Sequence, residues 1–175
     1  GDAKEDQRLA QEMRVNPKEI SEHIMLVDLA RNDLSRSADD VQVDEYAETQ
    51  YYSHVIHMVS KVSGKLLEGK SSLDLYFDTF PAGTLSGAPK YRALQIIDEN
   101  EPSKRNFYGG AIVYFGLDGS VNHAIVIRSI LSKNNTLTYQ AGAGIVVGST
   151  PQGERNEIDN KVAAIRRAII NAIEI

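Results

Sequence analysis

The sequence predicts an α+β fold in which a largely antiparallel sheet packs with helices. Two observations support this prediction. Apolar residues repeat at helical spacing near both ends of the 175 residues, and segments rich in β-branched and aromatic residues follow one another in between. The chain has no evident linker, internal repeat or low-complexity segment, so we expect one domain over residues 1–175.

The first third of the chain is expected to be mostly helical. The polar N-terminal segment has helical character, and a second helix is predicted over residues 17–35, because Asn16 supplies a cap and the next residue is a first-turn proline. Glu19 follows Asn16 by three residues, as in a capping box. The polar residues 35–50 are predicted to form a loop with one short strand, and residues 51–66 a strand.

Helices and strands also account for the rest of the chain. Ser71 and Ser72 are candidate caps of a short helix, and Ser86 is a candidate cap of a helix over residues 90–101. An Asp-Gly pair at 118–119 is a hairpin turn signal. The remaining predictions are three strands and a last helix, over residues 106–116, 122–132, 136–147 and 151–175.

Composition and charge exclude several classes of function. The chain has 19 basic and 24 acidic residues and a net charge of −5, whereas binding a nucleic-acid backbone needs a basic face. It has no cysteine, which excludes disulfides, thiolate zinc sites and a cysteine nucleophile. Uninterrupted apolar runs reach only about five residues, far short of a membrane span. We therefore expect a cytoplasmic protein without a signal peptide and with no nucleic acid or membrane as partner.

Two pairs of glutamates are candidate metal ligands. Glu19 and Glu22 are three residues apart on the predicted second helix. Glu154 and Glu157 repeat this spacing on the last helix, and Lys161 follows one turn later. Each pair shares one helix face, and if the two helices converge, up to four carboxylates meet in a group that suits Mg²⁺. The alternative is ordinary solvated charge on helix surfaces.

His54 and His57 are candidate functional imidazoles. On a helix their spacing would let both bind one metal, but on the strand predicted here they face opposite sides. One of the two is then a candidate for catalysis. The alternative for each is a structural role.

Two segments of small residues and one arginine are suited to binding an anion. Residues 83–90 lack the spacing of a phosphate loop, but they form a small-residue loop that leads into a helix N-terminus. Gly142, Ala143 and Gly144 let a ligand approach the backbone closely, unless they form a β-bulge. Arg128 lies in an otherwise apolar predicted strand, where a ligand carboxylate is one candidate partner.

Four segments cover nearly the whole chain from residue 16 onward: EHIMLVDLARNDLSR, FPAGTLSGAPKYRALQIIDE, FYGGAIVYFG and QAGAGIVVGSTPQGERNEIDNKVAAIRRAI. In this order they resemble the motifs of the chorismate-utilising enzymes, and most closely those of anthranilate synthase component I. The stretch PAGT resembles the anthranilate synthase form of its loop, whereas aminodeoxychorismate synthases carry a stretch closer to PGGSITGAPK. Aminodeoxychorismate synthase component I is therefore the alternative.

The resemblance implies that the chain is the C-terminal part of a chorismate-binding α/β sandwich, because subunits of this family are more than twice as long. It would then lack an N-terminal half that carries a tryptophan feedback site and a glutamate serving as an acid. The implied reaction converts chorismate and ammonia to anthranilate and pyruvate. The ammonia comes from glutamine through a separate glutamine amidotransferase subunit, component II. A catalytically inert fragment is a further alternative.

The resemblance also assigns roles to individual residues. Mg²⁺ would be held directly by Glu22 and Glu157, with Glu19 and Glu154 acting through water. His57 would be the acid or base for ammonia addition or pyruvate elimination. Tyr108 and Arg128 would bind the enolpyruvyl carboxylate. The ring carboxylate would be bound by Lys161 and by the backbone of Gly142, Ala143 and Gly144. Thr84 would contact the rest of the substrate.

Overall fold

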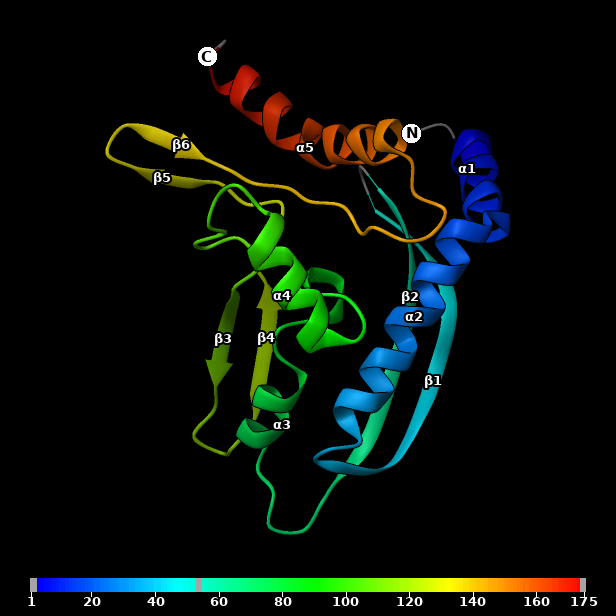
Figure 1. Cartoon of the computed structure of the whole chain (residues 1–175), viewed down its shortest axis with the longest axis vertical. Helices are drawn as coiled ribbons and strands as arrows, with labels where there is room; N and C mark the ends of the chain where they lie inside the picture. Colours follow the sequence, from blue (N-terminus) through cyan, green and yellow to red (C-terminus); the bar gives the residue numbers. More distant parts are fainter. Residues whose placement is uncertain (1–2, 53–54, 174–175) are drawn as a thin grey trace. The chain divides into compact units, whose positions relative to one another are not determined.

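The structure is a computed structural model, and it describes residues 3–52 and 55–173 (Figure 1). Helices alternate with small antiparallel sheets, which confirms the predicted α+β class. The chain packs as two units: the first comprises Gly1–Glu99 with Phe115–Val121, and the second Asn100–Tyr114 with Asn122–Ile175. The single domain expected over the whole chain stays a prediction.

The first unit begins with two consecutive helices, α1 (Ala3–Val15) and α2 (Pro17–Leu34). The predicted cap between them is present. The side-chain oxygen of Asn16 accepts hydrogen bonds from the amides of Lys18 at 2.9 Å and Glu19 at 3.5 Å. A proline at the first helical position leaves no amide in need of a partner. These local signals start α2 at the predicted residue.

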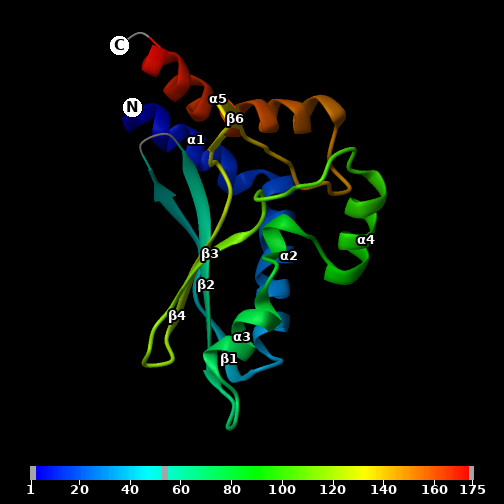
Figure 2. The same ribbon diagram turned by 90° about the vertical axis from the view of Figure 1, so that its left-hand side faces the viewer.

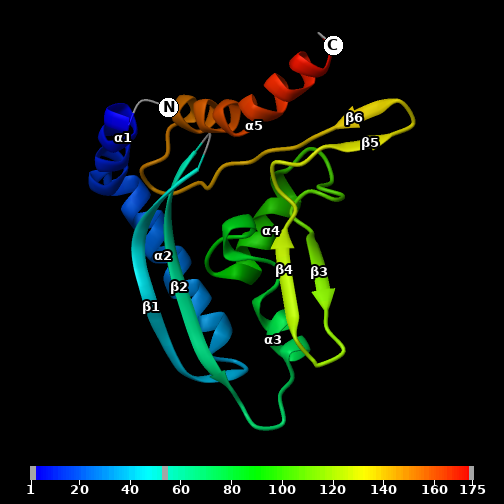
Figure 3. The same cartoon turned by 180° about the vertical axis from the view of Figure 1, so that it is seen from behind.

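A long antiparallel hairpin of β1 (Ala38–Tyr51) and β2 (Ile56–Leu66) follows the two helices. A loop with only one short strand was predicted over residues 35–50, and this is wrong, since most of the segment is strand. Val41 and Val43 are half-buried between exposed neighbours, and pairing with β2 gives partners to the backbone groups on one edge of this polar stretch. The helix α2 lies along one face of the hairpin, as Figures 1 and 2 show, and Figure 3 gives the opposite view.

Three short elements come next: α3 (Ser72–Thr79), the 3₁₀ turn η1 (Gly83–Leu85) and α4 (Lys90–Asn100). Ser71 caps α3 in a reciprocal capping box with Asp74, as predicted for this helix. The apolar core of the first unit is small, because few of its side chains are fully removed from water. Its buried apolar residues include Ala10, Val27, Ala38 and Leu85.

Two short hairpins follow, β3 (Ala111–Phe115) with β4 (Val121–Ile125), and β5 (Leu131–Lys133) with β6 (Thr136–Thr138). The Asp-Gly turn between β3 and β4 is confirmed, since the amide at residue 116 donates to the carbonyl at residue 120 over 2.8 Å. Each of these four strands is shorter than the predicted strand that it overlaps, and the one strand predicted over residues 122–132 is divided between β4 and β5. Residues 139–147 are irregular where the third strand was expected to continue.

The last helix, α5 (Pro151–Ile173), is confirmed over its described length. Thr150 Oγ1 accepts a hydrogen bond from the Gly153 amide at 3.2 Å, and proline again occupies the first helical position. Val162 and Ile165 form its buried stripe. In the described part of the chain, no helix is long and apolar enough to cross a membrane.

Candidate functional site

The Gly/Pro-rich loop over residues 80–90 presents Thr84 on the exposed side of η1. The next residue, Leu85, is buried and anchors this turn. Gly83 brings the loop backbone close to α2, because a Cβ added there would lie 2.7 Å from Leu29 Cδ2. The predicted substrate-binding threonine is therefore at the tip of a loop that rests on α2.

Polar contacts at the ends of this loop were not predicted from the sequence. Lys90 Nζ lies 2.6 Å from the buried carboxylate of Asp33 on α2 and donates a hydrogen bond to the Thr79 carbonyl at 3.0 Å. Ser86 does not cap α4 as predicted: its hydroxyl donates to the Ala82 carbonyl at 3.2 Å and closes the turn of η1. A lysine that ends a small-residue loop was the only sequence signal for the contact to Asp33.

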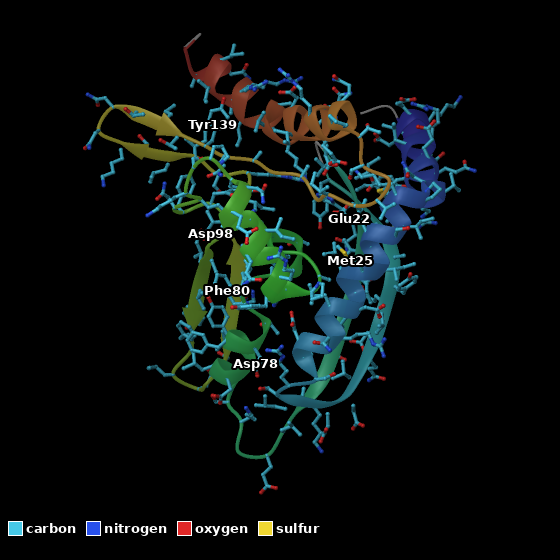
Figure 4. All side chains as sticks on the ribbon, viewed as in Figure 1. Glu22, Met25, Asp78, Phe80, Asp98 and Tyr139 are labelled. Carbon is cyan, nitrogen blue, oxygen red and sulfur yellow. The ribbon has the colours of Figure 1, made fainter. Side chains whose placement is uncertain are left out.

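The four glutamates predicted to hold Mg²⁺ are divided between the two units. Glu19 and Glu22 are half-buried on α2, where Figure 4 labels Glu22. Glu154, in the first turn of α5, is only 6% exposed, and Glu157 is half-buried one turn later. Among residues 3–52 and 55–173, no three His, Asp or Glu side chains gather as a metal site. Carboxylates are the donors that Mg²⁺ prefers, so the residue types fit this ion, while their convergence stays a prediction.

Predicted substrate residues of the second unit lie against one another. Lys161 Nζ is 2.7 Å from the carboxylate of Glu157 and donates a hydrogen bond to the Gly142 carbonyl at 3.0 Å. A Cβ added at Gly142 would lie 3.3 Å from the hydroxyl oxygen of Tyr108. Tyr108, Gly142, Glu157 and Lys161 thus form one continuous group, which we call the Lys161 cluster. Since residues 139–147 are not strand, the β-bulge alternative for Gly142–Gly144 does not apply.

An arginine that the sequence analysis missed supports Tyr108. The guanidinium carbon of Arg105 lies 5.9 Å from the centre of the Tyr108 ring, at the distance of a cation–π contact. Two hydrogen bonds from Arg105 to the carboxylate of Glu101 raise the pKa of the guanidinium. Because the Tyr108 amide also donates to the Arg105 carbonyl at 2.9 Å, backbone and side chain together orient this ring.

Arg128 is not in a strand, so the prediction that it alternates with apolar strand residues is wrong. The strand β4 ends at Ile125, and Arg128 is exposed with a φ of +50°. A left-handed residue without glycine's freedom is costly inside a pleated strand, and the chain bends there instead. The assigned role of Arg128 toward a substrate carboxylate stays a prediction.

The strand prediction is confirmed for His57, which lies in β2 opposite Gln50 of β1. Its ring is half-buried and meets the ring of Tyr52 edge to face, with 5.9 Å between ring centres. His54, the other candidate imidazole, lies outside the described residues. The catalytic role of His57 stays a prediction.

His23 is a second histidine of the first unit whose environment is distinctive. Burial lowers the pKa of its imidazole. Its Nε2 lies 2.7 Å from Ser60 Oγ on β2, and the same hydroxyl oxygen accepts a hydrogen bond from the Ala47 amide of β1 at 2.9 Å. His23 therefore connects α2 to both strands of the hairpin, a structural role that its sequence position did not reveal.

Comparison with known proteins gives a consistent family. The family described as chorismate binding enzyme matches residues 1–167 of the chain. Anthranilate synthase component 1 of Neisseria meningitidis serogroup A is 48% identical over 166 residues, which are 94% of this chain and 34% of that protein. The chain thus spans about a third of the length of the curated relatives it matches.

Two solved structures share the fold. Anthranilate synthase component I from Streptococcus pneumoniae TIGR4 gives a TM-score of 0.82 at 45% identity, over 91% of this chain and 37% of that one. A putative 2,3-dihydroxybenzoate-specific isochorismate synthase from Bacillus anthracis gives 0.87 at 30% identity, over 96% of this chain and 45% of that one. Backbone similarity alone therefore does not separate these two kinds of enzyme.

Proposed function

Because the chain belongs to the family of chorismate binding enzymes, we propose that it is part of the large subunit of an anthranilate synthase. Such an enzyme converts chorismate and ammonia to anthranilate and pyruvate. Relatives of that name at 46–48% identity favour this activity over that of aminodeoxychorismate synthase. The structural observation that carries the proposal is the Lys161 cluster.

The Lys161 cluster offers what a dicarboxylate substrate requires. Chorismate carries two negative charges, and the chain itself has a net charge of −5, so binding depends on locally placed cations and donors. In the proposal, the ammonium of Lys161 and the backbone at residues 142–144 bind the ring carboxylate. The hydroxyl of Tyr108 and the guanidinium of Arg128 bind the enolpyruvyl carboxylate.

The first unit would contribute one substrate contact and the group that transfers a proton. In the proposal, Thr84 contacts the substrate from the tip of its loop, and an imidazole nitrogen of His57 accepts or gives a proton. This proton moves either as ammonia displaces the allylic hydroxyl or as pyruvate leaves the ring. Imidazoles suit this task because they exchange protons near neutral pH.

Glu22 and Glu157 would hold Mg²⁺ directly, and Glu19 and Glu154 would hold it through water. The donor chemistry supports this assignment, since all four are carboxylates and Glu154 is buried at the start of a helix. When bound, the ion supplies positive charge that stabilises the ring carboxylate during the reaction.

The proposal also includes a cytoplasmic location and a glutamine amidotransferase as partner subunit. Amidotransferases of this pathway release ammonia with a cysteine thiolate, and none of these 175 residues is cysteine. Glutamine should therefore replace ammonia as the nitrogen source only when the partner subunit is added.

The test follows anthranilate fluorescence in the complete subunit supplied with chorismate, ammonium and Mg²⁺. We expect the wild-type subunit to form anthranilate and pyruvate in equal amounts. Glu22→Gln and Glu157→Gln should lose activity, and the activity that remains should no longer depend on Mg²⁺. The matched control is Asp159→Asn, which removes an exposed carboxylate of the same helix. Isochorismate or aminodeoxychorismate as the only product would overturn the proposal. Product from the 175-residue chain alone would exclude the inert-fragment alternative.

A further inference from the structure

The ion pair between Asp33 and Lys90 connects α2 to both ends of the loop that carries Thr84. Lys90 Nζ is 2.6 Å from Asp33 Oδ2, and it also donates to the carbonyl of Thr79 at 3.0 Å. Thr79 immediately precedes the loop and Lys90 is its last residue, so one side chain connects the two ends of the loop. The side chains of Asp33 and Lys90 are only 6% and 17% exposed. We call this arrangement the loop clamp.

The entry to the loop is fixed a second time by neighbouring groups. Ser37, which is completely buried after the end of α2, donates a hydrogen bond to the carboxylate of Asp78 on α3, labelled in Figure 4. The hydroxyl of Thr79 donates to the Leu75 carbonyl at 3.0 Å. Ser37 thus ties the last turn of α3 to the end of α2, and the Thr79 hydroxyl closes that turn within its own helix, so the carbonyl that Lys90 bonds is itself held in place.

A buried ion pair is an expensive way to obtain stability. The free-energy cost of removing two charges from water cancels much of the attraction between them. Aliphatic side chains of similar size often stabilise a core equally well. Aliphatic side chains at positions 33 and 90 could not, however, bond the carbonyl of Thr79. What the ion pair adds over an apolar pair is therefore the geometry of the loop.

We propose that Asp33 and Lys90 are positioning residues, which hold the loop over residues 80–90 so that Thr84 meets the substrate. This inference rests on the proposed function, in which Thr84 contacts chorismate. Misplacing a contacting group by about 1 Å can slow an enzyme on the order of a hundredfold. Loss of the loop clamp should therefore lower kcat by about 10- to 100-fold.

The test compares three variants of the complete subunit. Lys90→Met removes the loop clamp and leaves the Asp33 carboxylate buried without its cation. The double variant Asp33→Asn with Lys90→Met removes both charges, so the melting temperature should recover while the bond to Thr79 stays absent. Val27→Ala, a buried change on the same helix, is the control that destabilises the first unit without touching the loop clamp.

Three readouts separate positioning from stability. We expect kcat to fall in both Lys90 variants and the affinity for Mg²⁺ measured by calorimetry to stay constant. The backbone amides of the non-proline residues 80 and 82–88 should exchange hydrogen faster. Recovery of kcat together with melting temperature in the double variant would overturn the inference, as would an equal loss of kcat in Val27→Ala. Unchanged loop exchange would also overturn it. A wild-type subunit that forms no anthranilate would instead overturn the proposed function.

Discussion

Replacing Lys161 by methionine should change the affinities for Mg²⁺ and chorismate in opposite directions. The ammonium lies 2.7 Å from the carboxylate of Glu157, which the proposed function assigns to Mg²⁺. It therefore competes with the ion for the same oxygen atoms and repels it. The same ammonium is assigned to the ring carboxylate of chorismate, so its removal should weaken substrate binding.

The sizes of both effects follow from the exposure of the pair. The side chains of Lys161 and Glu157 are 32% and 29% exposed, and ion pairs with this access to water contribute about 0.5–1 kcal/mol. Since 1.4 kcal/mol is a factor of ten, Mg²⁺ should bind roughly two- to fivefold more tightly. A hydrogen bond to a charged group contributes about 1.5–3 kcal/mol, so the KM for chorismate should rise about 10- to 150-fold.

Calorimetry with Mg²⁺ alone, and anthranilate formation at saturating Mg²⁺, measure the two effects separately. Arg167→Met is the matched control, because it removes one cation from α5 ten residues beyond Glu157. That separation is about 15 Å along the helix, beyond the screening length of about 10 Å at 0.1 M salt. Weaker binding of Mg²⁺ to the Lys161 variant would refute the ligand assignment of Glu157, and an unchanged KM would refute the substrate contact.

Three further predictions concern the first unit. His57→Ala should lower anthranilate formation by about 10²–10⁴-fold with little change in chorismate affinity, and a kcat within threefold of wild type would argue against proton transfer there. Asn16→Ala removes the acceptor that lies 2.9 Å from the Lys18 amide, so urea unfolding should report a loss of about 1 kcal/mol, and an unshifted midpoint would contradict the cap. Burial lowers the pKa of His23 in the folded protein. As the pH falls below about 6.5, this imidazole is therefore protonated more readily in the unfolded chain, and the free energy of unfolding should fall. His23→Gln should flatten that decline in urea titrations between pH 7.5 and 5.5, and an unaltered decline would assign it to other groups.

Helix ends could be predicted because their causes are local. The caps Asn16 and Ser71 act on amides two or three residues away, and both helices begin where the sequence indicates. The length of β1 was missed because its polar composition resembles a loop, so only one short strand was predicted, whereas pairing with β2 makes a strand of Ala38–Tyr51. The end of β4 was placed too late, since nothing in the apolar run around Arg128 signals its left-handed backbone.

The contacts of the candidate site also separate into local ones, which the sequence could predict, and long-range ones, which it could not. The contact between Glu157 and Lys161 follows from their four-residue spacing on a helix, so the sequence could predict it. The contacts from Lys161 to Gly142 and from Lys90 to Asp33 join residues 19 and 57 positions apart. Such pairs depend on how the elements pack, which no local pattern encodes.

The exposed face of β3 has a practical consequence for work with these 175 residues. Ile112 and Tyr114 are two residues apart and so share one face of this strand, where they are 73% and 69% exposed. The sheet that contains β3 has two strands. An apolar strand with an open edge invites pairing with another copy, so concentrated samples of the isolated polypeptide should self-associate. Replacing both side chains with lysine would add like charges at that edge and should keep the polypeptide monomeric in light scattering.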